Sequence, residues 1–134
     1  MGLHHLDHYT IEAADMEATR AFYCGLLGLT EGHRPDLPFP GAWLYCENGL
    51  PTVHIIGSEP GAPPRSPSPP GLFHHISFAC TGAEAIRARL EAAKVDFKVV
   101  VLPGFGNTQF FMRDPNGISV ELNFPASEDR KSVV

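Results

Sequence analysis

The feature that most constrains the fold of this chain is an internal repeat with a period of 67 residues in a sequence of 134. The residues LDHYTI around His8 recur as FHHISF around His75, with the two histidines in equivalent places. His54 and Glu121 are separated by the same 67 residues. Because a repeat of this kind predicts two copies of one supersecondary unit, we expect two similar halves. Each half then carries two potential metal ligands at matching positions.

Hydrophobic alternation and turn residues give each half the order strand–helix–strand–strand–strand. In the first half Asp15 is the expected helix N-cap, Gly28 ends the helix, and Asn48-Gly49 marks a hairpin turn. The elements expected in that half are a strand over 6–12, a helix over 16–27, a loop or edge strand over 33–41, and strands over 42–46 and 51–56. Those expected in the second half are strands over 73–80, 97–102, 108–112 and 118–124, and a helix over 82–94.

A proline-rich segment, residues 60–71, separates the two halves. Proline has no backbone N–H donor, so this segment can form neither a helix nor a central strand. A chain of this length is ordinarily one domain. We therefore expect a single α+β domain, with one βαβββ module over about 4–59, the linker over 60–71, a second module over about 72–125 and a polar tail over 126–134.

Four predicted strands each place one potential metal ligand near their middle, on the face opposite their bulky apolar residues. The strands are 6–12, 52–56, 75–79 and 119–123, and their ligands are His8, His54, His75 and Glu121. The apolar residues expected to pack beneath the helices are Tyr9, Ile11, Val53, Ile55, Ile76, Phe78, Val120 and Leu122. The alternative is a solvent-exposed sheet face, but such a face more usually carries Lys, Glu and Arg than three histidines in register. His74 is expected to point to the opposite face from His75.

Composition excludes several classes of function. The net charge of −5 and the scattered Lys and Arg residues give no footprint for nucleic acid. No apolar run approaches the roughly twenty residues of a membrane-spanning helix, and the first residues lack the features of a signal peptide, so a cytoplasmic location is expected. Three widely spaced cysteines argue against a disulfide framework or a thiolate zinc site, and we expect free thiols that are mostly buried.

Two further motifs carry a resemblance to a known family. The first half contains Phe22-Tyr-x-x-x-Leu-Gly28, and the second contains Asp114-Pro-x-Gly-x-x-x-Glu121. Nearly the whole chain, apart from linker and tail, resembles the vicinal oxygen chelate superfamily. That superfamily includes glyoxalase I, extradiol dioxygenases, fosfomycin-resistance thiol transferases, methylmalonyl-CoA epimerase and bleomycin resistance proteins.

The resemblance implies a specific architecture and site. Paired βαβββ modules would curl into a cup-shaped mixed sheet around one divalent metal ion, with ligands that fall on His8, His54, His75 and Glu121. Members of this size are usually homodimers. Imidazole and carboxylate ligands suit Zn, Fe, Mn, Co or Ni and do not choose among them.

Departures from the family patterns narrow the activity. In glyoxalase I the ligand that matches His54 is a glutamate, so this chain has only one carboxylate where two help to move a proton. Extradiol dioxygenases carry a histidine and a tyrosine before the Asp-Pro-x-Gly motif, where this chain has Phe111 and no histidine at 102–104. Bleomycin-binding members lack the ligand quartet that this chain keeps.

The sequence is therefore interpreted as a metal-dependent enzyme, a lyase or isomerase of glyoxalase type, acting on a small substrate with vicinal oxygens. Glu121 is the only carboxylate of the quartet and so the candidate base. Trp43, Tyr45, Phe110 and Phe111 are candidate walls of the substrate pocket or, alternatively, core aromatics. Two other functions stay open: an Fe(II)-dependent dioxygenase, and a binding protein that sequesters a small molecule without turnover.

Overall fold

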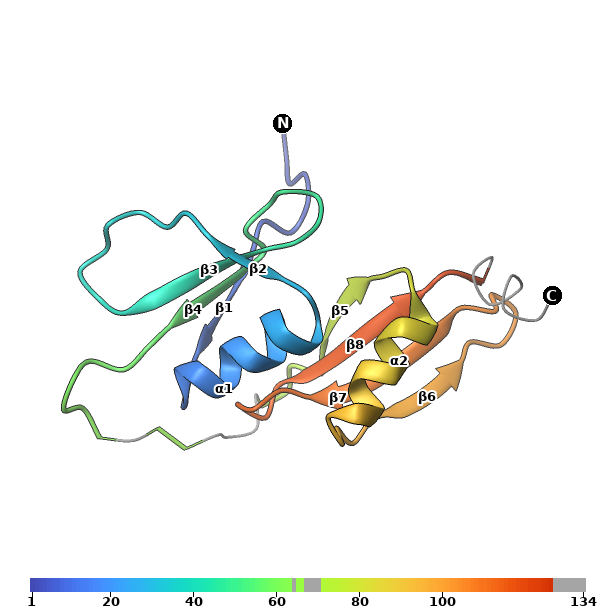
Figure 1. The fold of residues 1–134 in the computed structure, drawn as a ribbon. Coiled ribbons are helices and arrows are strands. Elements are labelled where there is room, and N and C mark those ends of the chain that lie inside the picture. The colour runs from blue at the N-terminus through green and yellow to red at the C-terminus, as the bar shows by residue number, and fades with distance from the viewer. Residues whose placement is uncertain (64, 67–70, 127–134) are drawn as a thin grey trace. The chain divides into compact units, whose positions relative to one another are not determined.

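The computed structural model describes residues 1–63, 65–66 and 71–126. The chain divides into two compact units, Met1–Pro67 and Ser68–Val134, and the division falls inside the proline-rich segment. Part of the expected linker (64 and 67–70) and of the expected tail (127–134) lies outside the described residues. Each unit has one four-stranded mixed sheet and one helical segment on a face of that sheet (Figure 1).

The first unit follows the order predicted from its sequence. Its elements are β1 (Tyr9–Glu12), α1 (Met16–Arg20), a π-helical continuation η1 (Ala21–Leu26), β2 (Thr30–Gly32), β3 (Gly41–Tyr45) and β4 (Val53–Ile56). The strand order in the sheet is β1-β4-β3-β2, with β1 parallel to β4 and the other neighbours antiparallel.

The second unit repeats this topology. Its elements are β5 (Ile76–Ala79), α2 (Ala83–Ala92), β6 (Lys98–Val101), β7 (Thr108–Arg113) and β8 (Ser119–Phe124). The strand order is β5-β8-β7-β6, with β5 parallel to β8 and the other neighbours antiparallel. The α+β class with two βαβββ modules is therefore confirmed.

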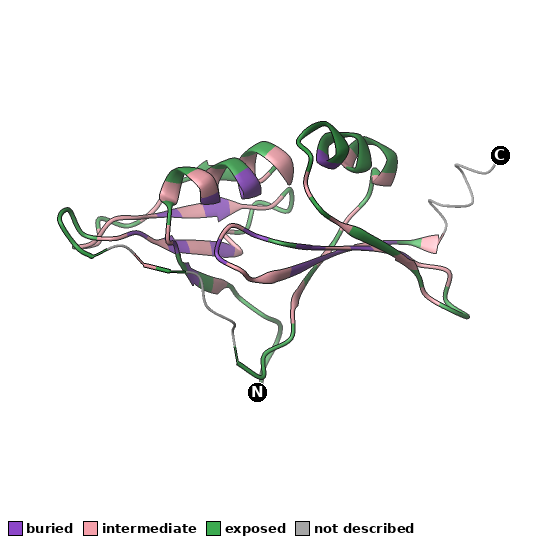
Figure 2. Ribbon diagram, turned by 90° about the horizontal axis from the view of Figure 1, so that it is seen from below, coloured by how far each residue is buried: buried purple, intermediate pink, exposed green. Residues whose placement is uncertain are grey.

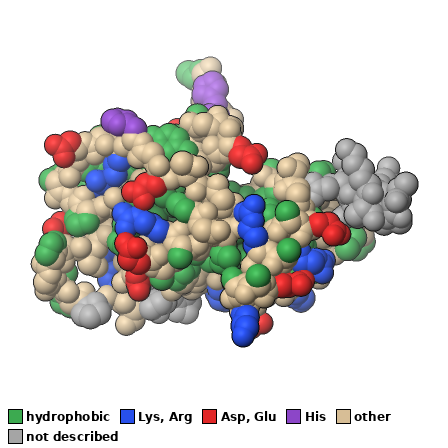
Figure 3. Space-filling view, viewed as in Figure 1, with side chains coloured by type: hydrophobic (Ala, Val, Ile, Leu, Met, Phe, Trp, Pro, Cys, Tyr) green, Lys and Arg blue, Asp and Glu red, His purple; other side chains and the backbone are tan. Residues whose placement is uncertain are grey.

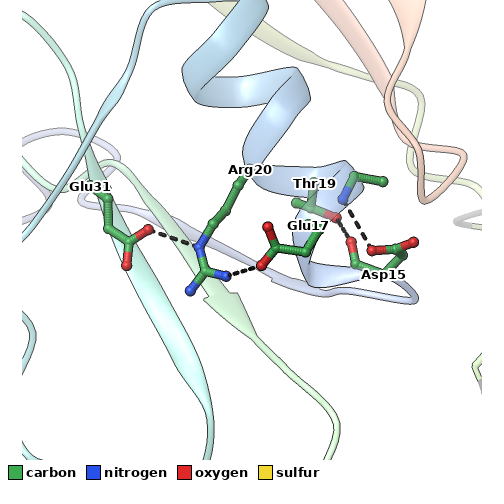
Figure 4. Close-up of polar contacts among 6 residues, drawn as sticks. Asp15, Glu17, Thr19, Arg20 and Glu31 are labelled. Carbon is green, nitrogen blue, oxygen red and sulfur yellow. Dashed lines mark hydrogen bonds and ion pairs between the residues drawn. The ribbon is translucent and has the colours of Figure 1, made fainter.

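The first helix begins where the sequence predicts. The carboxylate of Asp15 accepts a hydrogen bond from the backbone N–H of Ala18 at 3.1 Å, and the hydroxyl of Thr19 donates to the backbone carbonyl of Asp15 at 2.7 Å. One turn later Arg20 donates to Glu17 at 2.9 Å and to Glu31 of β2 at 2.8 Å (Figure 4). These contacts tie the start of the helix to the edge strand.

From Ala21 the helix is a π-helix, which is wider than the α-helix that the sequence predicts. The N–H of Leu27 donates to the carbonyl of Phe22 at 3.1 Å, five residues back, as in a π-helix. Gly28 then takes a left-handed φ of 84°, which ends the helix at the predicted place. The hydrophobic period of the sequence does not distinguish α-helical from π-helical hydrogen bonding, because both helices keep one apolar face toward the sheet.

The core of each unit lies between the helix and the sheet, where Figure 2 shows the buried strand positions. Five of the eight apolar residues predicted to pack there are buried, namely Ile11, Val53, Ile55, Val120 and Leu122. The other three, Tyr9, Ile76 and Phe78, are of intermediate exposure. Strand alternation therefore predicted the core face correctly in both units.

Several boundaries differ from the prediction. β1 begins at Tyr9 and β5 at Ile76, so His8 and His75 precede their strands instead of lying in mid-strand. Of the two alternatives for 33–41, residues 33–40 form a loop, because Pro35, Pro38 and Pro40 cannot donate to a strand ladder. The edge strand lies earlier, at Thr30–Gly32. All three cysteines are thiols outside any disulfide, as expected, but they are of intermediate exposure instead of buried.

Acidic and basic side chains are interspersed over the described part of the face in Figure 3. Among the helices that the structure describes, none combines the length and the apolar character needed to cross a membrane.

Candidate functional site

In the first unit, the ring of His54 lies between two other aromatic rings. His54 belongs to β4, and its register partners are Thr10 on β1 and Trp43 on β3. Its ring stacks on that of His8, with centroids 3.8 Å apart and planes 12° from parallel. The His54 ring also stacks on the ring of Trp43, with centroids 4.0 Å apart and planes 9° from parallel. Two predicted ligands and one predicted pocket aromatic are therefore in direct contact.

The tautomer of His8 is fixed by its neighbour in the chain. His8 Nδ1 and the carboxylate of Asp7 are 2.7 Å apart. A carboxylate can only accept, so the proton lies on Nδ1 of His8. In the neutral imidazole Nε2 then keeps its lone pair, which is the arrangement found when an outer carboxylate orients a metal-binding histidine. The same hydrogen bond lowers the pKa of the Asp7 carboxyl.

His54 carries a buried nitrogen that lacks a partner. Its Nε2 is enclosed and forms no hydrogen bond with any residue that the structure describes. Burial lowers the pKa of His54 below its ordinary value of 6.5, and the neighbouring His8 lowers it further, as, more weakly, does Arg34. His54 is therefore held as neutral imidazole, the form that binds a metal ion.

The second unit brings together the other two predicted ligands. His75 Nε2 and Glu121 Oε1 are 3.4 Å apart, and Glu121 is only 6% exposed. Ser77, the register partner of Glu121 across the parallel β5–β8 pair, donates a hydrogen bond to the second carboxylate oxygen. The hydroxyl holds one oxygen of Glu121, and the other faces the imidazole.

His74 departs from the prediction. Its Nδ1 lies 2.8 Å from Nδ1 of His75, and the two rings meet edge to face with centroids 5.1 Å apart. The expectation that the two side chains point to opposite sheet faces is wrong. Alternation applies within a strand, and β5 begins only at Ile76.

The predicted pocket aromatics have different surroundings. Phe111 meets the ring of His75 edge-on, with centroids 6.0 Å apart. The Tyr45 hydroxyl donates to the backbone carbonyl of His33 at 2.6 Å. Phe110 is fully buried and packs against Phe97 and Phe124. The burial of Phe110 supports its alternative interpretation as a core aromatic.

The donor atoms fit a divalent metal ion as two pairs. The first unit pairs two imidazoles, and the second pairs an imidazole with a carboxylate. Nitrogen and oxygen donors of these types suit first-row divalent metals. Among the residues that the structure describes, no three or more His, Cys, Asp or Glu side chains gather into a group that could hold a metal ion.

Three residues near these pairs were not singled out from the sequence as functional. Asp7 and Ser77 contact a predicted ligand directly, and Arg34 lies over Gly41 on the first sheet. Asp7 could have been found from its place next to His8. Ser77 could have been found from strand register with Glu121. Arg34 lies in an irregular loop and gives no periodic signal.

Comparisons with known proteins identify the family. The model of the Glyoxalase/Bleomycin resistance protein/Dioxygenase superfamily matches residues 5–122. The uncharacterized protein YaeR of Escherichia coli (strain K12) is 30% identical over 127 residues, which cover 91% of this chain and 97% of YaeR.

Solved structures have the same fold. A glyoxalase/bleomycin resistance protein/dioxygenase domain from Frankia sp. EAN1pec is 21% identical with a TM-score of 0.72, covering 92% of this chain and 93% of that one. A lactoylglutathione lyase from Agrobacterium tumefaciens is 20% identical with a TM-score of 0.62, covering 87% and 90%. With its two βαβββ units and these matches, the chain belongs to the glyoxalase/bleomycin resistance protein/dioxygenase superfamily.

Proposed function

We propose that this protein is a divalent-metal-dependent enzyme of lyase or isomerase type that acts on a small substrate with vicinal oxygens. The observation that carries the proposal is the environment of His54. Its buried Nε2 has no partner among the described residues, and its ring lies against His8. Leaving a buried polar atom unpaired is unfavourable, and a metal ion would satisfy it. The family resemblance implies that His75 and Glu121 supply the other two donors.

Each residue would have a distinct part in the reaction. A bound divalent metal would act as a Lewis acid toward the vicinal oxygens of the substrate. Glu121 is the one carboxylate of the four and would act as the base. It would accept the proton that the substrate loses at Oε1, the oxygen that faces His75. Ser77 would keep the carboxylate in place through Oε2. Asp7 would keep the proton of His8 on Nδ1, away from the metal-binding nitrogen.

Metal content tests this proposal. Elemental mass spectrometry on tag-free protein should find about one divalent metal per chain. The metal should be lost in His54→Ala, His75→Ala and Glu121→Ala, with circular dichroism unchanged. His33→Ala, at an exposed loop position, is the matched control and should keep the metal. Wild-type protein that holds no metal, and takes up none on titration, would contradict the proposal.

Sequestration of a small molecule without turnover is a second candidate. One observation favours it: the stacked rings of His8, His54 and Trp43 form a layered aromatic surface. A binding protein of this kind would bind its ligand equally well after chelator treatment, whereas a metal-dependent enzyme would not. A dioxygenase would instead consume oxygen after anaerobic loading with Fe(II).

The homodimer expected from the sequence stays a prediction. In the second unit β6 is an edge strand, and its Val99 and Val101 side chains are 38% and 60% exposed. Exposed apolar residues on an edge strand are a common feature of strand-mediated association. Size-exclusion chromatography with light scattering gives the mass in solution, and a Val101→Lys variant tests whether this edge takes part.

A further inference from the structure

The arginines of the first unit differ in how their charge is balanced. The unit contains three, and Arg20 is paired with both Glu17 and Glu31 (Figure 4). Arg34 and Arg65 form no ion pair with any acidic residue that the structure describes, although Asp36 lies only two positions from Arg34. Among the described residues, two positive charges are therefore left without a carboxylate, in a chain whose net charge is −5.

The Arg34 guanidinium lies on the sheet face that carries His54. Its Nη2 donates to the backbone carbonyl of Phe39 at 2.8 Å and stands 2.9 Å from where a Cβ on Gly41 would be. Gly41 and Trp43 are two residues apart on β3, so they present the same face. The guanidinium thus lies roughly 7 Å along the strand from the level of Trp43 and His54.

Glycine at position 41 makes room for this arrangement. A side chain there would meet the Arg34 guanidinium and also the backbone carbonyl of Ile55, at 2.3 Å. The Arg34 side chain therefore takes the place that a β3 side chain would occupy on this face. Its Nε is buried without a hydrogen-bond partner among the described residues.

A second guanidinium lies at the same end of the strand pair. Arg65 Nη1 donates to the backbone carbonyl of Ile56 at 3.3 Å, and Ile56 is the register partner of Gly41. Ile56 is on the same face of β4 as His54, two residues further along. Glu12 faces the same side from β1, beyond Ile56, and forms no ion pair with either arginine in the described structure.

Arg34 could serve only to close its loop, through its bond to Phe39 and its position 5.1 Å above the Phe39 ring. That role uses one of its donors. A guanidinium offers five, arranged in a fork that matches carboxylate and phosphate. A guanidinium with no carboxylate partner in the described structure, on the face that carries His54, is a suitable receptor for an anion.

We propose that Arg34, assisted by Arg65, binds an anionic group of the substrate, either a carboxylate or a phosphate. The vicinal oxygens of the same substrate would then reach His8 and His54. This inference rests on the proposed function and narrows its substrate class. The spacing along β3 requires a short substrate, in which the anionic group is only a few bonds from the chelating oxygens. Ile56, half-buried and paired with Gly41, would contact the carbon chain at the end that carries the anionic group.

Three hydroxamates test the inference, because they share one metal-chelating head and one two-carbon tail. The tail ends in a methyl group, a carboxylate or a phosphonate. On metal-loaded wild-type protein, calorimetry should show the better of the two charged probes binding about tenfold or more tighter than the neutral one. Which charged probe binds more tightly distinguishes a carboxylate from a phosphate substrate.

The preference for charge should disappear in Arg34→Gln and be partly kept in Arg34→Lys. Arg89→Gln, at an exposed position of α2, removes the same charge and should leave the preference unchanged. If Arg34→Gln does not fold, Arg65→Gln replaces it, with a reduced preference expected. Equal binding of all three probes to wild type, or a preference that persists in Arg34→Gln, overturns the inference.

The two proposals fail in different ways. If metal and the neutral hydroxamate bind but the charged tails gain nothing, the anion site is wrong and the metal-dependent function stands. If the protein takes up no metal, the proposed function fails. In that case the charged probes are titrated into metal-free protein: a preference lost in Arg34→Gln supports the anion site, and no binding overturns it.

Discussion

The ring of Trp43 lies flat on the ring of His54, with centroids 4.0 Å apart and planes 9° from parallel. Trp43 is the only tryptophan in the chain, so its fluorescence reports on the surroundings of this one histidine. The contact gives a direct optical readout of whether a metal ion reaches His54.

Titration with Ni²⁺ or Cu²⁺ should quench the Trp43 emission in a saturable way, because a paramagnetic ion bound to His54 would lie next to the indole. The quenching should be lost in His54→Ala and kept in His33→Ala, whose imidazole belongs to an exposed loop. Emission is excited at a wavelength that tyrosine does not absorb. Equal quenching in both variants would mean that the metal binds elsewhere.

The Asp7 carboxylate should increase metal affinity because it orients His8, and not because it adds a negative charge. Asp7→Asn would remove the charged acceptor of the 2.7 Å hydrogen bond that holds the His8 proton on Nδ1. We expect metal affinity to fall by about 10- to 100-fold, as for other outer partners of metal-binding histidines. Asp36→Asn removes the same charge from an exposed position and is the control. Identical affinities for the two variants would show that Asp7 does not orient His8.

The repeat predicted more of this molecule than any local propensity. It located both four-stranded units and singled out four side chains that lie in two contacting pairs, because two halves that bury the same face must keep the same apolar and polar positions. Asp15, Gly28 and Asn48-Gly49 also lie at a helix start, a helix end and a turn, as predicted. These are places where backbone geometry restricts the choice of residue.

Applied to the aromatic residues, the strict period would misplace the counterpart of Trp43. Sixty-seven residues after Trp43 comes Phe110, but strand register pairs Glu121 with Phe111, whereas His54 pairs with Trp43. The second hairpin is one residue shorter, and a shift by one residue turns a side chain to the opposite face of the sheet. Arg34 could not be predicted for another reason: its position depends on how a proline-containing loop folds back over Gly41.

The stability of the metal-free protein should fall as the pH drops through about 6.5 in a way that depends on His54. Its folded pKa is lowered by burial, so below its ordinary pKa the unfolded chain binds a proton there that the folded chain does not. Protons therefore favour unfolding. Urea unfolding of wild type and His54→Gln across pH 5 to 8 measures this, with a chelator present. A pH dependence that is the same in both proteins would contradict the lowered pKa.

Truncation of Phe110 should lower the stability of the protein much more than truncation of Phe111. Phe110 is fully buried against Phe97 and Phe124, so Phe110→Ala would leave a cavity and lower the free energy of unfolding by about 3–5 kcal/mol. Phe111→Ala, at a half-buried position beside His75, should cost about 1 kcal/mol or less. Urea unfolding measures both.

Ligand binding gives the second half of this comparison. Phe111→Ala should weaken binding of the hydroxamates to the metal-loaded protein, because its ring meets His75, while Phe110→Ala, assayed where it is still folded, should bind them as wild type does. A fold that places neighbouring residues on opposite faces of one strand separates stability from binding at adjacent positions. Loss of hydroxamate binding in Phe110→Ala, with little loss of stability, would instead show that Phe110 lines the substrate pocket.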